Sequence, residues 1–222
     1  RQICYGVTRS WFYYDGVIEV LLDKPLPEKH IDLWLIVMAG LYSMDHLNRP
    51  QHASVNHAVE SVMKLGKPWA KGLVNAVLRR YGREKDTVKQ LVIKTEEARL
   101  NHPQWLIELI TADWPNYPEI FENNNNQPPM TLRVNTQKIT REKYLYKLAN
   151  ENIEARAGAF AQSAVILGKA MPVEALPGFG DGEVSVQDEA PQLVPELMNL
   201  EPGLSVIDAC AAPGGKTCHL LE

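Results

Sequence analysis

Apolar residues recur at a helical spacing through the first half of the chain. Pro25, Asn48–Pro50, Gly66 and Gly82 interrupt this pattern, and each is a typical end or break of a helix. Helices are therefore expected over residues 4–22, 31–47, 53–65, 68–81, 88–100, 103–114 and 117–124. The second of them is apolar nearly all round, which indicates the buried centre of a bundle. Consecutive helices with short connections predict an all-α domain.

The pattern changes at a polar stretch, residues 123–129, which reads Asn-Asn-Asn-Asn-Gln-Pro-Pro and is typical of a domain boundary. Beyond it, alternation predicts strands over residues 130–136, 153–160, 164–167 and 183–187. Two helices are expected between and after these strands, over 140–150 with Thr140 as N-cap and over 189–200 opened by Asp188. We therefore expect a helical domain over 1–122, a small α+β domain over 123–183, and the start of an α/β domain over 184–222.

The end of the chain joins an apolar run to a glycine-rich loop. Residues 204–207 predict a buried parallel strand, Asp208 follows, and a helix is expected to begin near Gly215. A strand, a loop of small residues and a helix in this order are typical of a cofactor-binding α/β domain. The small residues let the loop backbone approach a ligand, and the start of the helix offers free N–H groups to a carboxylate or phosphate.

Three kinds of loop compete for this stretch. A P-loop ends as residues 215–217 do, Gly-Lys-Thr, but its first glycine would fall on Cys210. A dinucleotide fingerprint needs glycines where Cys210 and Ala212 stand. In the methyltransferase loop, an acidic residue is followed by small residues at every second position. This pattern is satisfied by Asp208, Cys210, Ala212 and Gly214. A glycine-rich turn without a ligand is the remaining interpretation.

Four segments of the sequence resemble one family. The string Asp-Ala-Cys-Ala-Ala-Pro-Gly-Gly-Lys-Thr at 208–217 resembles the S-adenosylmethionine loop of the RNA cytosine-5 methyltransferases. Residues 129–136, Pro-Met-Thr-Leu-Arg-Val-Asn-Thr, and 186–188, Val-Gln-Asp, resemble segments that precede this loop in the same enzymes. Residues 71–80 resemble a helix of NusB-like RNA-binding domains. Taken in order, they resemble the RsmB family of Sun/Fmu-type 16S ribosomal RNA cytosine-5 methyltransferases.

The resemblance implies methyl transfer from S-adenosylmethionine to carbon-5 of a cytosine in 16S rRNA or a small-subunit assembly intermediate. It places the cofactor on the loop residues Cys210, Ala211, Ala212, Pro213, Gly214, Gly215 and Lys216. The family's catalytic cysteines, in Thr-Cys and Pro-Cys motifs, would lie beyond Glu222, so we expect no catalytic residue and no turnover in this chain alone. We expect Cys218 to be packed inside the first helix. The alternatives are a non-catalytic NusB-like RNA-binding module and a cytosine-5 methyltransferase of another RNA, such as tRNA.

Positive charge recurs between residues 64 and 85, and this is either a solvated helix face or a surface that contacts RNA phosphates. The members are Lys64, Lys67, Lys71, Arg79, Arg80, Arg83 and Lys85. We select Arg79 and Arg80 as candidate RNA-binding residues. Arg133 is a third candidate, with an ion pair between domains as its alternative role. The net charge of −4 argues against a chain that coats nucleic acid everywhere.

The remaining features point to an ordinary globular protein. Three cysteines and scattered histidines lack the spacing of a disulfide framework or a zinc site, so no metal is expected. The longest apolar stretch, residues 33–41, is too short to span a bilayer, and no leader pattern opens the chain. We expect a cytoplasmic monomer without membrane contact. The sequence opens on Arg1 within a helical pattern, so we expect a longer parent protein.

Overall fold

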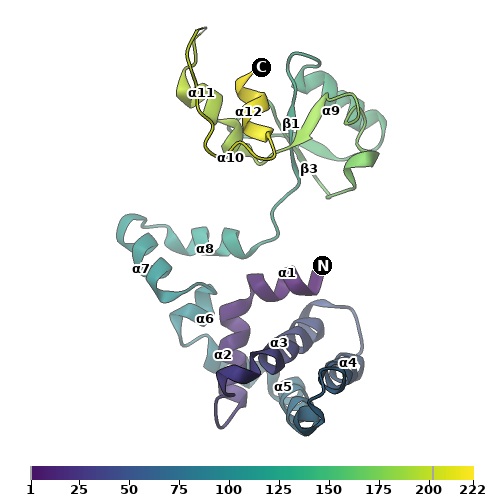
Figure 1. Ribbon diagram of the computed structural model, residues 1–222, viewed down its shortest axis with the longest axis vertical. Coiled ribbons are helices and arrows are strands. Elements are labelled where there is room, and N and C mark those ends of the chain that lie inside the picture. Colours follow the sequence, from purple (N-terminus) through teal and green to yellow (C-terminus); the bar gives the residue numbers. More distant parts are fainter. Residues whose placement is uncertain (1, 202) are drawn as a thin grey trace. The chain divides into compact units, whose positions relative to one another are not determined.

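The computed structural model describes residues 2–201 and 203–222, and they form two compact units that divide between Asn126 and Gln127 (Figure 1). The first unit is helical and the second combines strands with short helices. The division into three domains, with boundaries at residues 123 and 184, stays a prediction.

The helices of the first unit are α1 (Gln2–Arg9), α2 (Trp11–Leu21), α3 (Ile31–His46), α4 (Gln51–Lys64), α5 (Lys71–Val92), α6 (Glu96–Leu100), α7 (Gln104–Asp113) and α8 (Tyr117–Asn125), with 3-10 turns η1 (Glu28–His30) and η2 (Pro68–Ala70). The second unit has β1 (Thr131–Val134), α9 (Arg141–Asn150), β2 (Ala155–Ala157), β3 (Ala164–Leu167), η3 (Val173–Ala175), β4 (Val184–Val186), α10 (Glu189–Gln192), α11 (Val194–Met198) and α12 (Gly215–Leu220).

Helix α3 is the centre of the helical unit, as its apolar pattern predicts. It packs against α1, α2, α4 and α5, and Figure 1 shows these helices grouped around it. Leu33, Met38 and Leu41 of α3 are completely buried. Burial of apolar side chains such as these is the main contribution to the stability of a helical bundle.

The first expected helix is divided in two at Ser10, and Asn101 holds the break. The backbone N–H of Tyr13 donates to Oδ1 of Asn101 over 3.0 Å, and Nδ2 of Asn101 donates to the carbonyl of Arg9. The same amide group also donates to Oδ1 of Asn125 over 3.0 Å. Asn101 has a positive φ of 58°, a left-handed conformation that Asn tolerates better than most residues. One side chain thus ties the α1–α2 break to α6 and α8.

The expected end of a helix at Gly82 is wrong, because α5 continues through it to Val92. A Cβ atom at Gly82 would lie 1.2 Å from Nε2 of Gln51, so the end of this α4 side chain occupies the space beside the glycine. The helix bends just afterwards, at Glu84, whose φ is −115°. The expected helix over 88–100 is correspondingly the end of α5 followed by the short α6.

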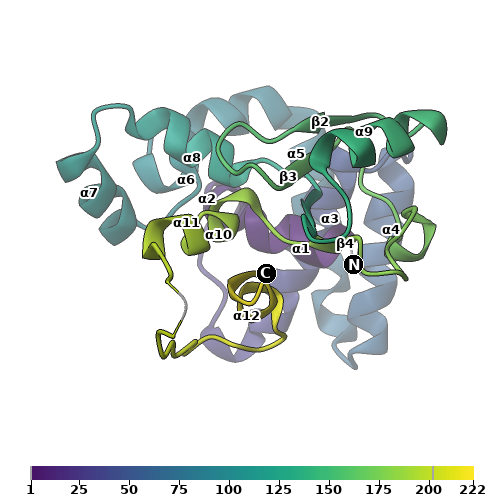
Figure 2. The same ribbon diagram turned by 90° about the horizontal axis from the view of Figure 1, so that it is seen from above.

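The second unit contains a four-stranded antiparallel sheet in the order β2-β3-β1-β4. Side chains alternate between its faces. Leu132 and Val134 of β1 join Val165 and Leu167 of β3 in a core with residues of α9, and Figure 2 shows α9 beside β2 and β3. Thr140 caps α9 as expected, because its Oγ1 accepts from the N–H of Lys143. The intervening β1 residues are polar, and α10 packs against this strand.

Two expectations for the C-terminal stretch are wrong. Residues 204–207 form no strand, and Ile207 is 91% exposed. A strand needs a neighbour for its backbone hydrogen bonds, and no described strand pairs with this run. The helix expected over residues 189–200 is two short helices, α10 and α11. Asp188 precedes the first of them, but its side chain makes no capping hydrogen bond.

Candidate functional site

The loop after residue 207 is organised by one carboxylate. Oδ1 of Asp208 accepts from the N–H of Cys210 over 2.9 Å, and Oδ2 accepts from Oγ1 of Thr217 over 2.7 Å. The side chain therefore joins the start of the loop to the first turn of α12. The hydrogen bond from Thr217 is the main reason why the pKa of Asp208 lies below its usual value, with help from the Cys210 N–H and the positive charge of Lys216.

The backbone at the end of this loop is open to a ligand. Gly214 has a φ of +107°, which favours glycine over every other residue. A Cβ at Gly215 would meet nothing within 4 Å, and one at Gly214 would meet only Sγ of Cys218, at 3.9 Å. The first N–H groups of a helix have no intrahelical acceptor, and at the start of α12 no side chain caps them. The geometry fits a ligand that presents a carboxylate to these N–H groups.

The remaining predicted loop residues lie on the surface. Cys210, Ala211, Ala212 and Pro213 are exposed, whereas Gly214, Gly215 and Lys216 are partly buried. The expectation that Cys218 is packed inside the helix is wrong, because this side chain is exposed.

The basic stretch of the first unit separates into paired and unpaired side chains. Three of its members form ion pairs: Lys67 with Asp32 at 2.6 Å, Arg80 with Glu84 at 3.0 Å, and Lys85 with Asp45 at 2.6 Å. Among the described residues, no ion pair involves Lys64, Lys71, Arg79 or Arg83.

Arg79 and Arg80, the neighbouring arginines selected from the sequence, also differ in whether they form an ion pair. Arg79 is exposed, and its Nε donates to Oδ1 of Asn75 over 3.0 Å. Arg80 also donates from Nη1 to the carbonyl of Leu21 over 3.2 Å, in addition to its pairing with Glu84. Arg79 is thus free to contact a phosphate, and Arg80 is already used to hold α2 and α5 together.

Arg133, the third candidate, is buried and paired within the second unit. Its Nη1 lies 2.5 Å from Oε1 of Glu222, and its side chain is 5% exposed. The Nε2 amide of Gln137 donates to the backbone carbonyl of Glu222 over 2.7 Å. This arrangement favours the ion-pair role over phosphate contact. The ion pair joins β1 to Glu222, which follows α12. No pattern in the sequence predicts this pair.

Sequence patterns also missed a glutamine that organises the polar side of the sheet. Gln192 is 1% exposed, and its Oε1 accepts from Oγ of Ser163 over 2.9 Å. Its Nε2 donates to the carbonyls of Gln187 and Leu132, over 2.9 and 3.3 Å. By contrast, both side-chain polar atoms of Gln187 are buried without a partner among the described residues. A buried, polar residue in a short helix gives no recognisable pattern in the sequence.

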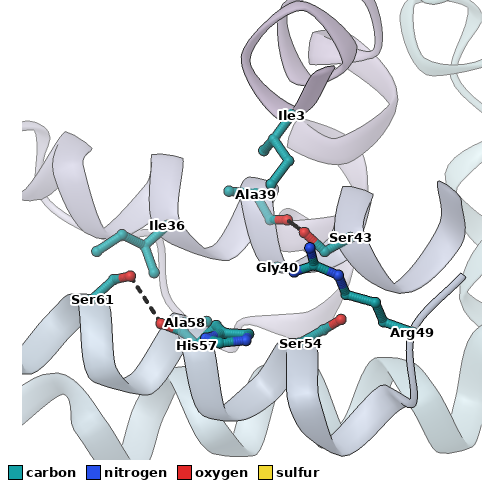
Figure 3. Close-up of a pocket in the computed structure, with 10 residues that line it drawn as sticks. All are labelled: Ile3, Ile36, Ala39, Gly40, Ser43, Arg49, Ser54, His57, Ala58 and Ser61. Carbon is teal, nitrogen blue, oxygen red and sulfur yellow. Dashed lines mark hydrogen bonds between the residues drawn. The ribbon is translucent and has the colours of Figure 1, made fainter. Parts of the chain in front are cut away.

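A separate pocket of about 220 Å³ lies between α1, α3 and α4 (Figure 3). Two of its serines are bonded within their own helices, since Ser61 donates to the carbonyl of His57 and Ser43 to that of Ala39. The buried hydroxyl of the third, Ser54, has no partner among the described residues. None of the residues selected from the sequence contributes to it.

Neither a cluster of metal ligands nor a membrane-spanning helix is found in the parts of the chain that the structure describes. They contain no group of three or more His, Cys, Asp or Glu side chains placed to hold a metal ion. None of their helices combines the length and apolar character that crossing a bilayer requires.

Comparison with protein families gives two matches. Residues 1–83 match the NusB family, and residues 102–174 match the RsmF/B-like methyltransferase family's ferredoxin-like domain. The helical bundle and the four-stranded antiparallel sheet agree with these two descriptions. The predicted order of a NusB-like domain and a small α+β domain is confirmed.

Curated relatives match along the whole chain. A probable ribosomal RNA small subunit methyltransferase B of Coxiella burnetii is 44% identical over 100% of this chain and 52% of its own length. Ribosomal RNA small subunit methyltransferase B of Pseudomonas putida is 43% identical over 100% of this chain and 51% of its own. The chain therefore spans about half the length of these relatives. The crystal structure of PH0851 has a similar fold, with a TM-score of 0.71 and 21% identity over 99% of this chain and 50% of that one.

Proposed function

On the premise that this chain is homologous along its whole length to ribosomal RNA small subunit methyltransferase B proteins, we propose a function for the longer protein that the relatives' length implies. That protein transfers a methyl group from S-adenosylmethionine to carbon-5 of a cytosine in small-subunit ribosomal RNA. The observation that carries the proposal is the 44% identity over 100% of the chain. Contact with ribosomal RNA would take place in the cytoplasm of a bacterium.

The loop from Cys210 to Lys216 would hold the cofactor. Its small side chains and the uncapped start of α12 suit a carboxylate, such as that of the methionine part of S-adenosylmethionine. When bound, this cofactor supplies an electrophilic methyl group. The chain's contribution is to bind and orient it: Asp208 fixes the loop through Cys210 and Thr217, and Lys216 adds a positive charge near the carboxylate.

The test uses the longer protein with Gly214→Val. A valine cannot adopt the positive φ of this position without strain, and its branched side chain would enter the space that faces the ligand. We expect binding of S-adenosylmethionine, measured by calorimetry, and tritiated methyl transfer to unmodified small-subunit rRNA to be lost together. Gly180→Val is the matched control, because Gly180 has open space around it.

Titration with ATP separates the P-loop interpretation from the proposed one. Binding of S-adenosylmethionine but not ATP supports a methyltransferase loop. ATP binding that is lost in Gly214→Val would instead favour a nucleotide-binding loop. Unchanged binding of S-adenosylmethionine by Gly214→Val would refute the placement of the cofactor on residues 210–216.

A further inference from the structure

The ion pair between Arg133 and Glu222 connects the sheet of the second unit to the end of α12, the helix that follows the loop over residues 210–216. Arg133 lies in β1, and its backbone is paired with Ala164 of β3 on one side and with Ser185 of β4 on the other. Side chains on paired strands are positioned more precisely than side chains on loops. Arg133 is therefore a fixed point from which α12 can be held.

Glu222 supplies the charge that compensates this arginine. The side chain of Arg133 is 5% exposed and that of Glu222 is 13% exposed. Nε of Arg133 has no hydrogen-bond acceptor among the described residues, so the guanidinium group depends on its contact with the carboxylate. Removing one partner of a buried ion pair leaves an uncompensated charge, which is strongly unfavourable. The cost of separating the pair keeps Glu222 beside β1.

The backbone of Glu222 is held by the same part of the unit. Nε2 of Gln137, three residues after the end of β1, donates to the Glu222 carbonyl over 2.7 Å. The N–H groups of Leu221 and Glu222 donate to the carbonyls of Cys218 and His219, over 3.3 and 3.4 Å. The position of Glu222 thus determines where the last turn of α12 lies.

The other end of α12 is bonded to the loop. Oγ1 of Thr217 donates to Oδ2 of Asp208 over 2.7 Å, and Oδ1 of the same carboxylate accepts from the N–H of Cys210. The N–H of Cys218 donates to the carbonyl of Gly214 over 2.8 Å. The helix has six residues, which corresponds to a length of about 9 Å. A displacement at its last turn is therefore transmitted to the loop.

We propose that Arg133 is a positioning residue for the loop over residues 210–216: it holds Glu222, Glu222 holds α12, and α12 holds the loop. The choice of S-adenosylmethionine as the ligand of the loop rests on the proposed function, whereas the link from Arg133 to α12 does not. The role requires the guanidinium group to stay on Glu222, so Arg133 acts on the ligand through α12 and makes no contact with RNA.

The first measurement is hydrogen exchange of the longer protein without cofactor, followed by mass spectrometry of its peptides. Arg133→Met should make exchange roughly tenfold faster, or more, in a peptide over residues 215–222, because α12 then opens without its link to the sheet. A peptide over α9 should exchange as in the wild type, which shows that the second unit is still folded.

The second measurement is calorimetric titration of the same proteins with S-adenosylmethionine. Arg133→Met and Glu222→Gln should each raise the dissociation constant about ten- to a hundredfold, since a remote change that displaces a site by about 1 Å can cost about a hundredfold. The double variant should bind no more weakly than the weaker single variant, because both changes remove one shared interaction. Arg133→Lys should stay within about threefold of the wild type, since its ammonium group still supplies a point charge to Glu222.

The kinetics distinguish positioning of the loop from a contribution to the fold alone. In methyl transfer to small-subunit rRNA, Arg133→Met should raise KM for S-adenosylmethionine and leave kcat at saturating cofactor unchanged. Arg156→Met is the matched control, because it makes the same substitution at an exposed position of β2, where the arginine forms no ion pair among the described residues. It should change the dissociation constant by less than about twofold.

Three outcomes would overturn the proposal. Unchanged exchange of residues 215–222 in Arg133→Met would show that the ion pair does not hold α12. Additive losses in the double variant would show that the two residues act separately. Fewer binding sites per protein with an unchanged dissociation constant would show that Arg133 stabilises the fold alone. Absence of S-adenosylmethionine binding by the wild-type protein would instead overturn the proposed function, and the exchange measurement, which contains no cofactor, would still decide whether Arg133 holds α12.

Discussion

The two units differ in how completely their buried polar groups are hydrogen-bonded. In the helical unit, Asp45 receives hydrogen bonds from the hydroxyls of Tyr14 and Tyr81, at 3.0 and 2.8 Å, and lies 2.6 Å from the ammonium of Lys85. In the sheet unit, buried atoms of Tyr144, Ser185, Gln187 and His219 lack partners among the described residues, whereas in the helical unit the buried atom with neither a hydrogen bond nor an ion pair is Oγ of Ser54. A buried polar group without a partner opposes folding, so the first unit is the better complemented of the two.

Two apolar runs, one in each unit, differ in how far they are buried. Leu41 is completely buried, whereas Ile207 is 91% exposed, although both stand in runs that predict burial. A hydrophobic run thus predicts a buried element only where other elements supply a surface to cover it. Four predictions test this difference in burial and partnering, from the largest expected effect to the smallest.

Leu41→Ala should reduce the free energy of unfolding of the helical unit by about 2–5 kcal/mol, because it leaves a cavity in a packed core. Ile207→Ala should change stability by less than about 0.5 kcal/mol, since its side chain is already in water. Urea unfolding followed by tryptophan fluorescence measures Leu41→Ala, because all five tryptophans lie in the first unit, at positions 11, 34, 69, 105 and 114. The NMR methyl signals of Val165 and Leu167 measure Ile207→Ala in the second unit. Equal effects would contradict the contrast.

Asp45→Asn should cost the helical unit about 2–3 kcal/mol. The amide weakens two hydrogen bonds to a charged acceptor and removes the ion pair with Lys85. Asp86→Asn, an exposed carboxylate on the same helix as Lys85, is the control and should be nearly neutral. The same fluorescence measurement applies, and a neutral Asp45→Asn would show that the network is dispensable.

Two buried glutamines of the sheet unit should respond in opposite ways. Gln192→Met should cost about 1–3 kcal/mol, because the partners of Gln192, including Oγ of Ser163, lose their hydrogen bonds. Gln187→Met should be neutral or stabilising within about 1 kcal/mol, because its amide has no partner to lose. Urea unfolding followed by the NMR methyl signals of Val165 and Leu167 measures both. A large loss in Gln187→Met would mean that its amide has an ordered partner.

The smallest effect concerns pH. Burial lowers the pKa of His219, the charge of Arg133 lowers it further, and Glu222 and Glu196 act in the opposite direction. The unfolded chain, with a histidine pKa of about 6.5, then binds the proton more readily than the folded one. The stabilising contribution is present above about pH 6.5 and is lost as pH falls through the lowered pKa. His219→Gln should flatten this loss in the same NMR assay, and an unaltered pH profile would exclude His219 as its source.

Local patterns predicted most helices and the N-cap of α9, because spacing and capping are properties of neighbouring residues. They failed at Gly82, where the helix continues and the space beside the glycine is filled by Gln51, a residue 31 positions away on another helix. They also failed to separate the paired from the free cations, because Asp32 and Asp45 reach Lys67 and Lys85 only through the packing of α3. The pattern of the loop for which we propose cofactor binding was recognisable, and Thr217, the hydrogen-bond partner of Asp208, lies within the same motif.

The tie made by Asn101 has a consequence for synthesis on the ribosome. The break between α1 and α2 exposes backbone groups of Arg9 and Tyr13, and both find their partner in a residue translated about 90 positions later. The first helices can form early, but the angle between them is fixed only after residue 101 has left the exit tunnel. The beginning of the chain is thus completed by a later part of its own domain, at a time when the second unit is still being synthesised.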